Sequence, residues 1–188
     1  SCILNKNEAM EAVLRESWLK QPVWYKLYKT DLIRDIPFAV GKCHEDVFWS
    51  WQAVARAKKV SIFDTPCYFY LQRGSSIMGS GFSEKRLDSI EAKCIRQDYL
   101  MKHYPALAEA DRCALHFSCM YLGQQAVRVL PKERLDPVLA YLNGVLERYP
   151  VSRETVKAQT LTHRGWLLLA GKSLKQTCRL RNRLKIGL

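Results

Sequence analysis

The clearest pattern of apolar and polar positions in the chain begins just after residue 46. Apolar side chains there recur at the three- and four-residue spacing that places them on one face of an α-helix. This spacing predicts a helix that starts near 44–46, with Glu45 and Asp46 in its first turn. Lys58 and Lys59 follow its far end, where positive charge suits the helix dipole. The apolar residues of this face are Val47, Phe48, Trp51, Val54 and Ala55.

Shorter segments on both sides of this helix predict further elements. Residues 7–16 have helical spacing, and 30–33 fit a capped helical turn. Alternating positions predict a strand over 23–28, with Trp24 and Lys26 on the same side. Two more strands are expected, over 60–63 and 67–73.

Beyond the glycine-rich link at 79–81 the pattern becomes entirely helical, so this link is the expected domain boundary. Pro131 and Pro150 separate the helical patterns, and Ser152 is placed to cap the last of them. The expected helices span 83–102, 106–129, 132–148 and a segment that begins after 152.

Length and composition are those of a globular chain, with 188 residues of which 48% are hydrophobic and 11% aromatic. We predict an α+β fold, predominantly helical, with a small sheet in a domain over 1–82 and a helical bundle over 83–188. No apolar run reaches the roughly 20 residues that a membrane-spanning helix needs. The seven cysteines are odd in number and never form Cys-x-x-Cys. They predict reduced thiols in a cytoplasmic protein, and a zinc site is not expected.

The net charge of +12 predicts an anionic partner. Basic residues concentrate over 163–188, a segment without any acid that also contains many leucines. Two interpretations stay open for it: an amphipathic segment on an anionic membrane surface, or a solvated basic helix whose leucines pack on the bundle. The first places the protein peripherally on the inner face of the membrane. Because the aromatic-basic pattern of single-strand binders is missing, nucleic acid is not an expected partner.

Glu45 and Asp46 are the first candidates for chemistry. Acids in the first turn of a helix usually only complement its dipole, which contributes roughly 0.3–1 kcal/mol each. A carboxylate held at a rigid helix tip can also accept a proton from a hydroxyl. Lys26 has two interpretations as well: it binds a phosphate or carboxylate, or it extends along the surface like most lysines.

Four motifs follow one another between 23 and 88: Val-Trp-x-Lys-Leu-Tyr, His-Glu-Asp-Val-Phe, Tyr-x-Tyr-x-Gln-Arg-x-x-Ser-Ile-Met and Phe-Ser-x-Lys-Arg-Leu-Asp. In this order and spacing they resemble the second half of family 2 glycosyltransferases, which have the GT-A fold. The resemblance covers about 23–87. Beyond about residue 90 the chain matches the family only in being helical and basic at its end.

The resemblance implies an inverting, nucleotide-sugar-dependent glycosyltransferase that builds a cell-surface polysaccharide or glycolipid. Asp46 and Glu45 form the implied catalytic pair, with Asp46 as the base that takes the proton of the acceptor hydroxyl. His44 would shape the acceptor pocket together with Glu45. Gln72 and Arg73 would lie near the departing diphosphate. The remaining implied substrate-binding residues are Trp24, Lys26 and Ser76.

The chain also departs from the family. The family's nucleotide-binding half, with its Asp-x-Asp metal site, precedes the matched region, and Asp-x-Asp does not occur here. We therefore expect the C-terminal part of a longer enzyme, which needs Mg²⁺ or Mn²⁺ as a whole, whereas this part alone binds none and is inactive. Tyr25 replaces the usual asparagine, and Arg73 stands where many relatives have histidine, which argues against metal ligation there.

The expected partners are a nucleotide sugar and a glycan or lipid-linked acceptor. An alternative of another class is a non-catalytic, basic helical adaptor or membrane-surface binding module. In that case the acids at the helix tip and the Gln72–Arg73 corner are structural only.

Overall fold

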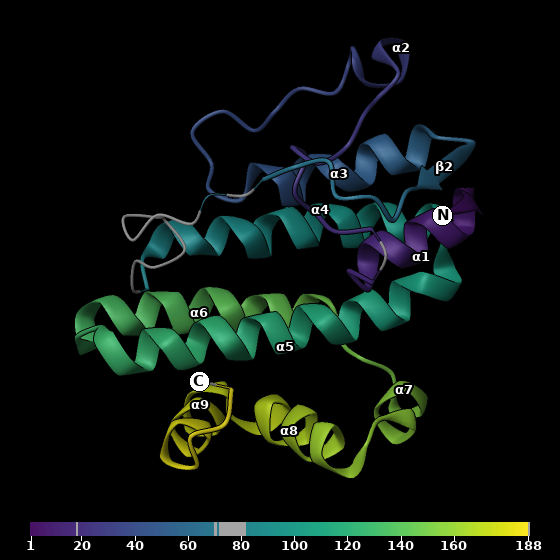
Figure 1. The fold of residues 1–188 in the computed structure, drawn as a ribbon. Coiled ribbons are helices and arrows are strands. Elements are labelled where there is room, and N and C mark those ends of the chain that lie inside the picture. Colours follow the sequence, from purple (N-terminus) through teal and green to yellow (C-terminus); the bar gives the residue numbers. More distant parts are fainter. Residues whose placement is uncertain (18, 70, 72–81, 188) are drawn as a thin grey trace. The chain divides into compact units, whose positions relative to one another are not determined.

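The computed structural model describes residues 1–17, 19–69, 71 and 82–187 (Figure 1). The chain divides into two compact units, a sheet unit over 1–81 and a helical unit over 82–188. Helices predominate among the described residues, and the sheet found there has two antiparallel strands. This confirms the predicted fold class, α+β and predominantly helical.

In the sheet unit, β1 (Cys2–Asn5) pairs with β2 (Lys59–Ile62), so that the first residue of β1 lies opposite the last residue of β2. The helix α1 (Lys6–Leu14) follows β1 without a loop. Asn5 ends the strand and caps the helix, because its side chain accepts the backbone N–H of Glu8 at 3.1 Å. The Glu8 carboxylate accepts the backbone N–H of Asn5 at 2.8 Å in return, which completes a capping box.

The central helix α3 (Glu45–Arg56) begins within the predicted range and is buried along most of its length. Trp49 anchors the preceding loop, because its indole N–H donates to the Ile36 carbonyl at 2.9 Å and its ring stacks on Phe38 at 5.0 Å. The predicted turn over 30–33 is the short helix α2 (Thr30–Ile33), although no side chain caps its start. Ile33 packs against the cluster of Ile36, Trp49 and Ala53. The buried residues of α3 are Phe48, Trp49, Ser50, Trp51, Ala53, Val54 and Ala55.

Two predicted strands are wrong. Residues 23–26 form a turn, in which the Lys26 amide donates to the Val23 carbonyl at 3.3 Å. Alternation alone cannot make a strand, because a strand needs a partner for its backbone, and neither β1 nor β2 pairs with these residues. The strand expected over 67–73 is absent at 67–69 and 71, and its remaining residues lie outside the described ranges. The strand expected over 60–63 is confirmed as β2, one residue earlier.

The helical unit has three layers, with α4 on one side of α5 and α6, and with α8 and α9 on the other (Figure 1). A cluster of buried apolar side chains drawn from these helices forms its core. Each fully buried leucine or isoleucine contributes about 1.5–3 kcal/mol to such a core. The elements are η2 (Glu84–Leu87), α4 (Asp88–His103), α5 (Pro105–Val129), α6 (Lys132–Arg148), α7 (Arg153–Ala158), α8 (Leu161–Lys172) and α9 (Leu174–Arg183).

Two buried features fix α5 in the middle layer. A Cβ atom at Gly123 would lie 3.0 Å from Cys178 Sγ and 3.4 Å from Leu142 Cδ1, so the missing side chain lets α5 approach α9 and α6 closely. On the other side, Arg96 of α4 forms two hydrogen bonds with Asp111 of α5, at 2.6 and 3.3 Å. None of the helices in the described ranges combines the length and apolar character needed to cross a lipid bilayer.

Candidate functional site

The tip of α3 is held by an unusual backbone turn. His44, directly before the helix, has φ 58° and ψ 43°, in the left-handed region, and Gly41 has φ 78°. A non-glycine residue in that region costs on the order of 1–3 kcal/mol unless its surroundings hold it there. The buried face of α3 supplies that restraint. The turn therefore sets the direction in which the first residues of the helix, Glu45 and Asp46, leave the backbone.

The two adjacent carboxylates at this tip have different surroundings. Glu45 is exposed, whereas Asp46 is half-buried, and its Oδ1 accepts the Val47 amide at 2.9 Å. Burial raises the pKa of the Asp46 carboxyl above its ordinary value, and the negative charge of Glu45 acts in the same direction. The Val47 hydrogen bond and His44 lower this pKa by smaller amounts. Asp46 is thus a stronger base than an ordinary aspartate.

Lys26 lies in the turn at 23–26, close enough to Asp46 for their charges to interact. Its ammonium group donates to the carbonyl of Lys20 at 2.6 Å, to that of Pro22, and to that of Gln21 at 3.5 Å. Burial lowers the pKa of Lys26 to about 8, although the carboxylate of Asp46 opposes this shift. A phosphate or carboxylate ligand would have to replace one of these carbonyls.

An aromatic group stands beside Lys26. The Lys26 Nζ lies 4.1 Å from the centre of the Tyr25 ring. The Trp24 ring contacts those of Tyr25 and Tyr68, with ring centres 5.0 and 4.4 Å apart. Burial raises the pKa of Tyr25 to about 12, and Asp46 adds to this shift. Trp24 remains 45% exposed. Aromatic faces with this exposure can stack on the apolar faces of a sugar ring.

The structure describes five of the eight predicted site residues, and these five differ in burial. Asp46, His44 and Lys26 are half-buried, Glu45 and Trp24 are exposed. The remaining three predicted residues, Gln72, Arg73 and Ser76, lie outside the described residues.

Sequence reasoning did not include Tyr25 and Tyr68 among the site residues. On a strand, Tyr25 would lie on the opposite side from Trp24 and Lys26. The turn at 23–26 instead gathers all three. The available signal was Pro22, which precedes the turn and favours a break in regular structure.

Replacing Lys26 with methionine should destabilise the sheet unit by about 1–3 kcal/mol, because three backbone carbonyls lose their donor. Since burial lowers the pKa of Lys26 from 10.5 to about 8, the unfolded state binds more protons than the folded state between these values. The advantage of the wild type over Lys26→Met should therefore grow as the pH rises through that window.

Urea unfolding followed by tryptophan fluorescence measures this effect, because four of the five tryptophans lie in the sheet unit. Lys29→Met, at an exposed lysine nearby, is the control and should be near neutral. A Lys26→Met variant as stable as Lys29→Met at every pH would contradict the assigned role of the ammonium group.

Metal ligands do not gather anywhere in the described ranges: no group of three or more His, Cys, Asp or Glu side chains is placed to hold a metal ion there. The residues at the α3 tip thus do not by themselves fit a divalent cation. Comparison of the chain with known protein families, with curated proteins and with solved structures found no match.

Proposed function

We propose that the sheet unit is the acceptor-binding and catalytic-base part of an inverting, nucleotide-sugar-dependent glycosyltransferase, with Asp46 as the base. The observation that carries this proposal is the environment of Asp46. Its carboxylate stands at a rigid helix tip, and partial burial raises its pKa. A base with a raised pKa holds the transferred proton better than an ordinary aspartate does.

The chemistry that follows is a single displacement. Asp46 Oδ1 is engaged by the Val47 amide, and we assign the second carboxylate oxygen to the acceptor hydroxyl. As the hydroxyl oxygen bonds to the anomeric carbon, its proton passes to Asp46. The bond from that carbon to the phosphate oxygen breaks, and its electron pair leaves with the nucleoside diphosphate. Because attack and departure occur on opposite faces of the sugar, the anomeric configuration inverts.

Neighbouring side chains support the same assignment. The exposed rings of Trp24, Tyr25 and Tyr68 offer apolar surface to a sugar, and Glu45 and His44 border the acceptor side of Asp46. The charge of Asp46 acts on Lys26, whose ammonium group holds the neighbouring backbone through its hydrogen bonds. In this proposal Gln72, Arg73 and Ser76 contact the diphosphate, and that part of the site stays a prediction.

A divalent cation, Mg²⁺ or Mn²⁺, would neutralise the leaving diphosphate when bound. Since no cluster of three His, Cys, Asp or Glu ligands occurs among the described residues, we assign the ion to the Asp-x-Asp half that the resemblance places before this chain. The nature of the product, a cell-surface polysaccharide or glycolipid, likewise stays a prediction.

The test compares Asp46→Asn with Glu45→Gln in the longer enzyme that the resemblance implies, in which an Asp-x-Asp half precedes these residues. The assay measures release of nucleoside diphosphate from UDP-, GDP- and dTDP-linked hexoses with glycan and lipid-linked acceptors in the presence of Mg²⁺ or Mn²⁺. Asp46→Asn should lower the rate at least about 100-fold, because it removes the general base. Glu45→Gln removes the same charge from the adjacent, exposed position and should change the rate only a few-fold.

Circular dichroism of both variants shows whether they fold. A folded Asp46→Asn variant that transfers at the wild-type rate contradicts the proposal, as does a wild-type protein that releases no nucleoside diphosphate from any donor. In either case the non-catalytic alternative, a basic helical module with a merely structural acidic tip, becomes the better interpretation.

A further inference from the structure

In the layer formed by α8 and α9, one face packs against the rest of the helical unit. Trp166 of α8 and Cys178 of α9 are buried in the core. Arg181 also points inward, because its Nε donates to the side chain of Gln124 at 3.0 Å and its guanidinium lies 5.2 Å from the Trp166 ring centre. Asn182 donates to the Gln124 carbonyl at 3.1 Å. These contacts fix the rotation of both helices on the bundle.

With their rotation fixed, both helices present leucines on their outer faces. Leu161 and Leu168, seven residues apart and so on the same side of α8, are 82% and 55% exposed. The others are Leu169, Leu180 and Leu184, at 41%, 39% and 54%. Leu167 and Leu174 pack in the bundle core, as the second interpretation of this segment expects, whereas these five leucines remain exposed. Exposed apolar side chains gathered on one face mark an interaction surface.

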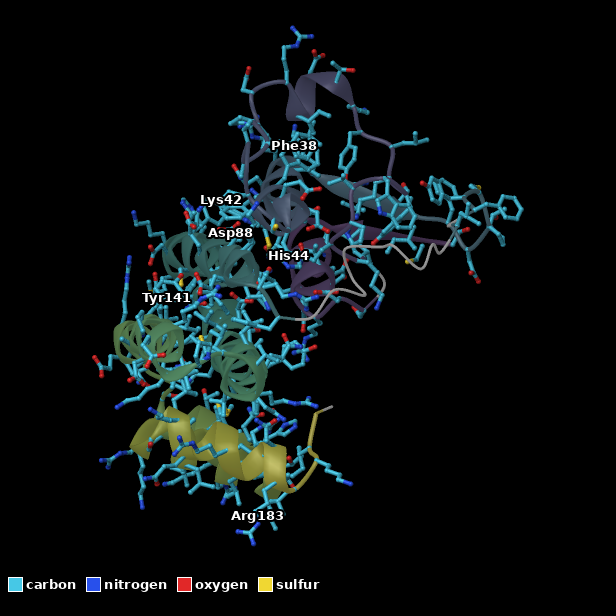
Figure 2. All side chains as sticks on the ribbon, turned by 90° about the vertical axis from the view of Figure 1, so that its left-hand side faces the viewer. Phe38, Lys42, His44, Asp88, Tyr141 and Arg183 are labelled. Carbon is cyan, nitrogen blue, oxygen red and sulfur yellow. The ribbon has the colours of Figure 1, made fainter. Side chains whose placement is uncertain are left out.

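Cations lie among these leucines. Arg179 and Arg183 are exposed at adjacent turns of α9, and Figure 2 shows Arg183 on the outer side of the helix, pointing away from the rest of the bundle. Lys172 is exposed at the end of α8. Lys175 is different, because it pairs with Asp136 of α6 at 2.8 Å. The segment over 155–188 contains no acid of its own, although Asp136 of α6 offsets part of the positive charge near Lys175 and Arg179.

A hollow beside this face also combines apolar and basic side chains. Its volume is about 800 Å³, and it opens between α6, α7 and α8. Leu146, Leu167 and Val156 line it, Arg153 and Lys157 contribute positive charge, and Glu147 is the one acid among the described residues of the lining. Leu168 and Lys172 belong both to the hollow and to the outer face. An apolar lining with basic side chains at the same opening is complementary to one acyl chain and its phosphate.

We propose that the outer face of α8 and α9 docks on an anionic lipid membrane. The leucines enter the boundary between headgroups and acyl chains, and the arginines bind lipid phosphates, with both helices lying in the plane of the surface. Charge and apolarity together select this partner. A nucleic acid would use the arginines but leave the leucines in water, and no aromatic side chain stands among them to stack on bases.

The experiment is co-sedimentation of the full protein with vesicles, without any sugar donor, so that its outcome does not depend on the proposed transferase. Vesicles of phosphatidylcholine alone are compared with equal mixtures of phosphatidylcholine and phosphatidylglycerol. We expect binding to the mixed vesicles that weakens with added salt. Equal binding to both kinds of vesicle, or to neither, overturns the proposal.

Two double variants separate charge from insertion. Each basic side chain near an anionic surface raises partitioning about fivefold, so Arg179→Gln/Arg183→Gln should lower it about thirtyfold. Leu161→Gln/Leu168→Gln should lower it roughly tenfold or more, because apolar area no longer leaves water. Lys85→Gln/Lys102→Gln removes the same charge from exposed lysines outside this face. Partitioning that falls as far in this control as in the arginine variant also overturns the proposal.

Discussion

Replacing Arg96 with methionine should lower the free energy of unfolding of the helical unit by about 3–5 kcal/mol. The Arg96 and Asp111 side chains are 3% and 1% exposed, so almost no water reaches the pair. Their geometry is two-pronged, with Nη2 to Oδ1 at 2.6 Å and Nε to Oδ2 at 3.3 Å. Removing the arginine leaves the Asp111 carboxylate buried without its counter-charge, which accounts for most of the loss.

Two further variants test this reason. Arg96→Met/Asp111→Leu replaces both charges by apolar side chains and should recover most of the stability. Arg134→Met breaks the exposed pair with Glu84, at 2.9 Å, and should cost less than about 1 kcal/mol. Guanidinium unfolding followed by circular dichroism compares all three. An Arg96→Met variant no less stable than Arg134→Met would show that the buried pair does not hold α4 to α5.

The second large effect is the dependence of sugar transfer on pH, which rests on the proposed role of Asp46. A general base works only when it is deprotonated, so below the pKa of Asp46 the rate should fall about tenfold for each pH unit. Burial raises that pKa above its ordinary value of 3.8, and the fall should therefore begin at a higher pH than for an ordinary aspartate. The measurement is the acid limb of the kcat/KM profile.

The pH dependence of stability distinguishes this loss of activity from acid unfolding. A carboxyl whose pKa is higher in the folded state binds its proton more tightly there than in the unfolded state. Between the ordinary and the raised pKa of Asp46, this group makes the protein more stable as the pH falls. Lost activity with an unchanged circular dichroism spectrum is thus the expected result. A rate that stays level down to pH 3.8 would contradict deprotonated Asp46 as the base.

The helices could be predicted from the sequence because their buried apolar residues recur at the helical period. In α3 the apolar spacing and the acids of the first turn both indicate the same start, and the helix begins at Glu45. In the helical unit, prolines mark the joints: Pro105 begins α5, and Pro131 directly precedes α6. Local signals of this kind do not depend on distant residues.

The strands could not be predicted as reliably, because a strand depends on its partner. Residues 23–28 alternate well but pair with neither strand found in the described ranges, and the backbone turns at Val23 instead. The segment Cys2–Asn5 is too short to show a period, and yet it pairs with Lys59–Ile62. Pairing between strands far apart in the sequence leaves no local pattern from which it could be predicted.

The candidate site, too, could be predicted from the sequence only in part. The position of Asp46 at a helix tip followed from local pattern, whereas its burial required the turn before α3 and the left-handed backbone of His44. The outer faces of α8 and α9 are a similar case. A leucine-rich segment has no preferred rotation until something such as Gln124 of α5 fixes one side of it.

The pairing of β1 with β2 has a consequence for what can join the sheet unit. Within the described residues each strand has one partner, so the backbone N–H and C=O groups along both outer margins of the sheet are available. A two-stranded ribbon is marginal by itself, and added strands make it more stable. Any extended segment, from the same polypeptide or another, can enlarge the ribbon by main-chain hydrogen bonding alone, without displacing a side chain of its core.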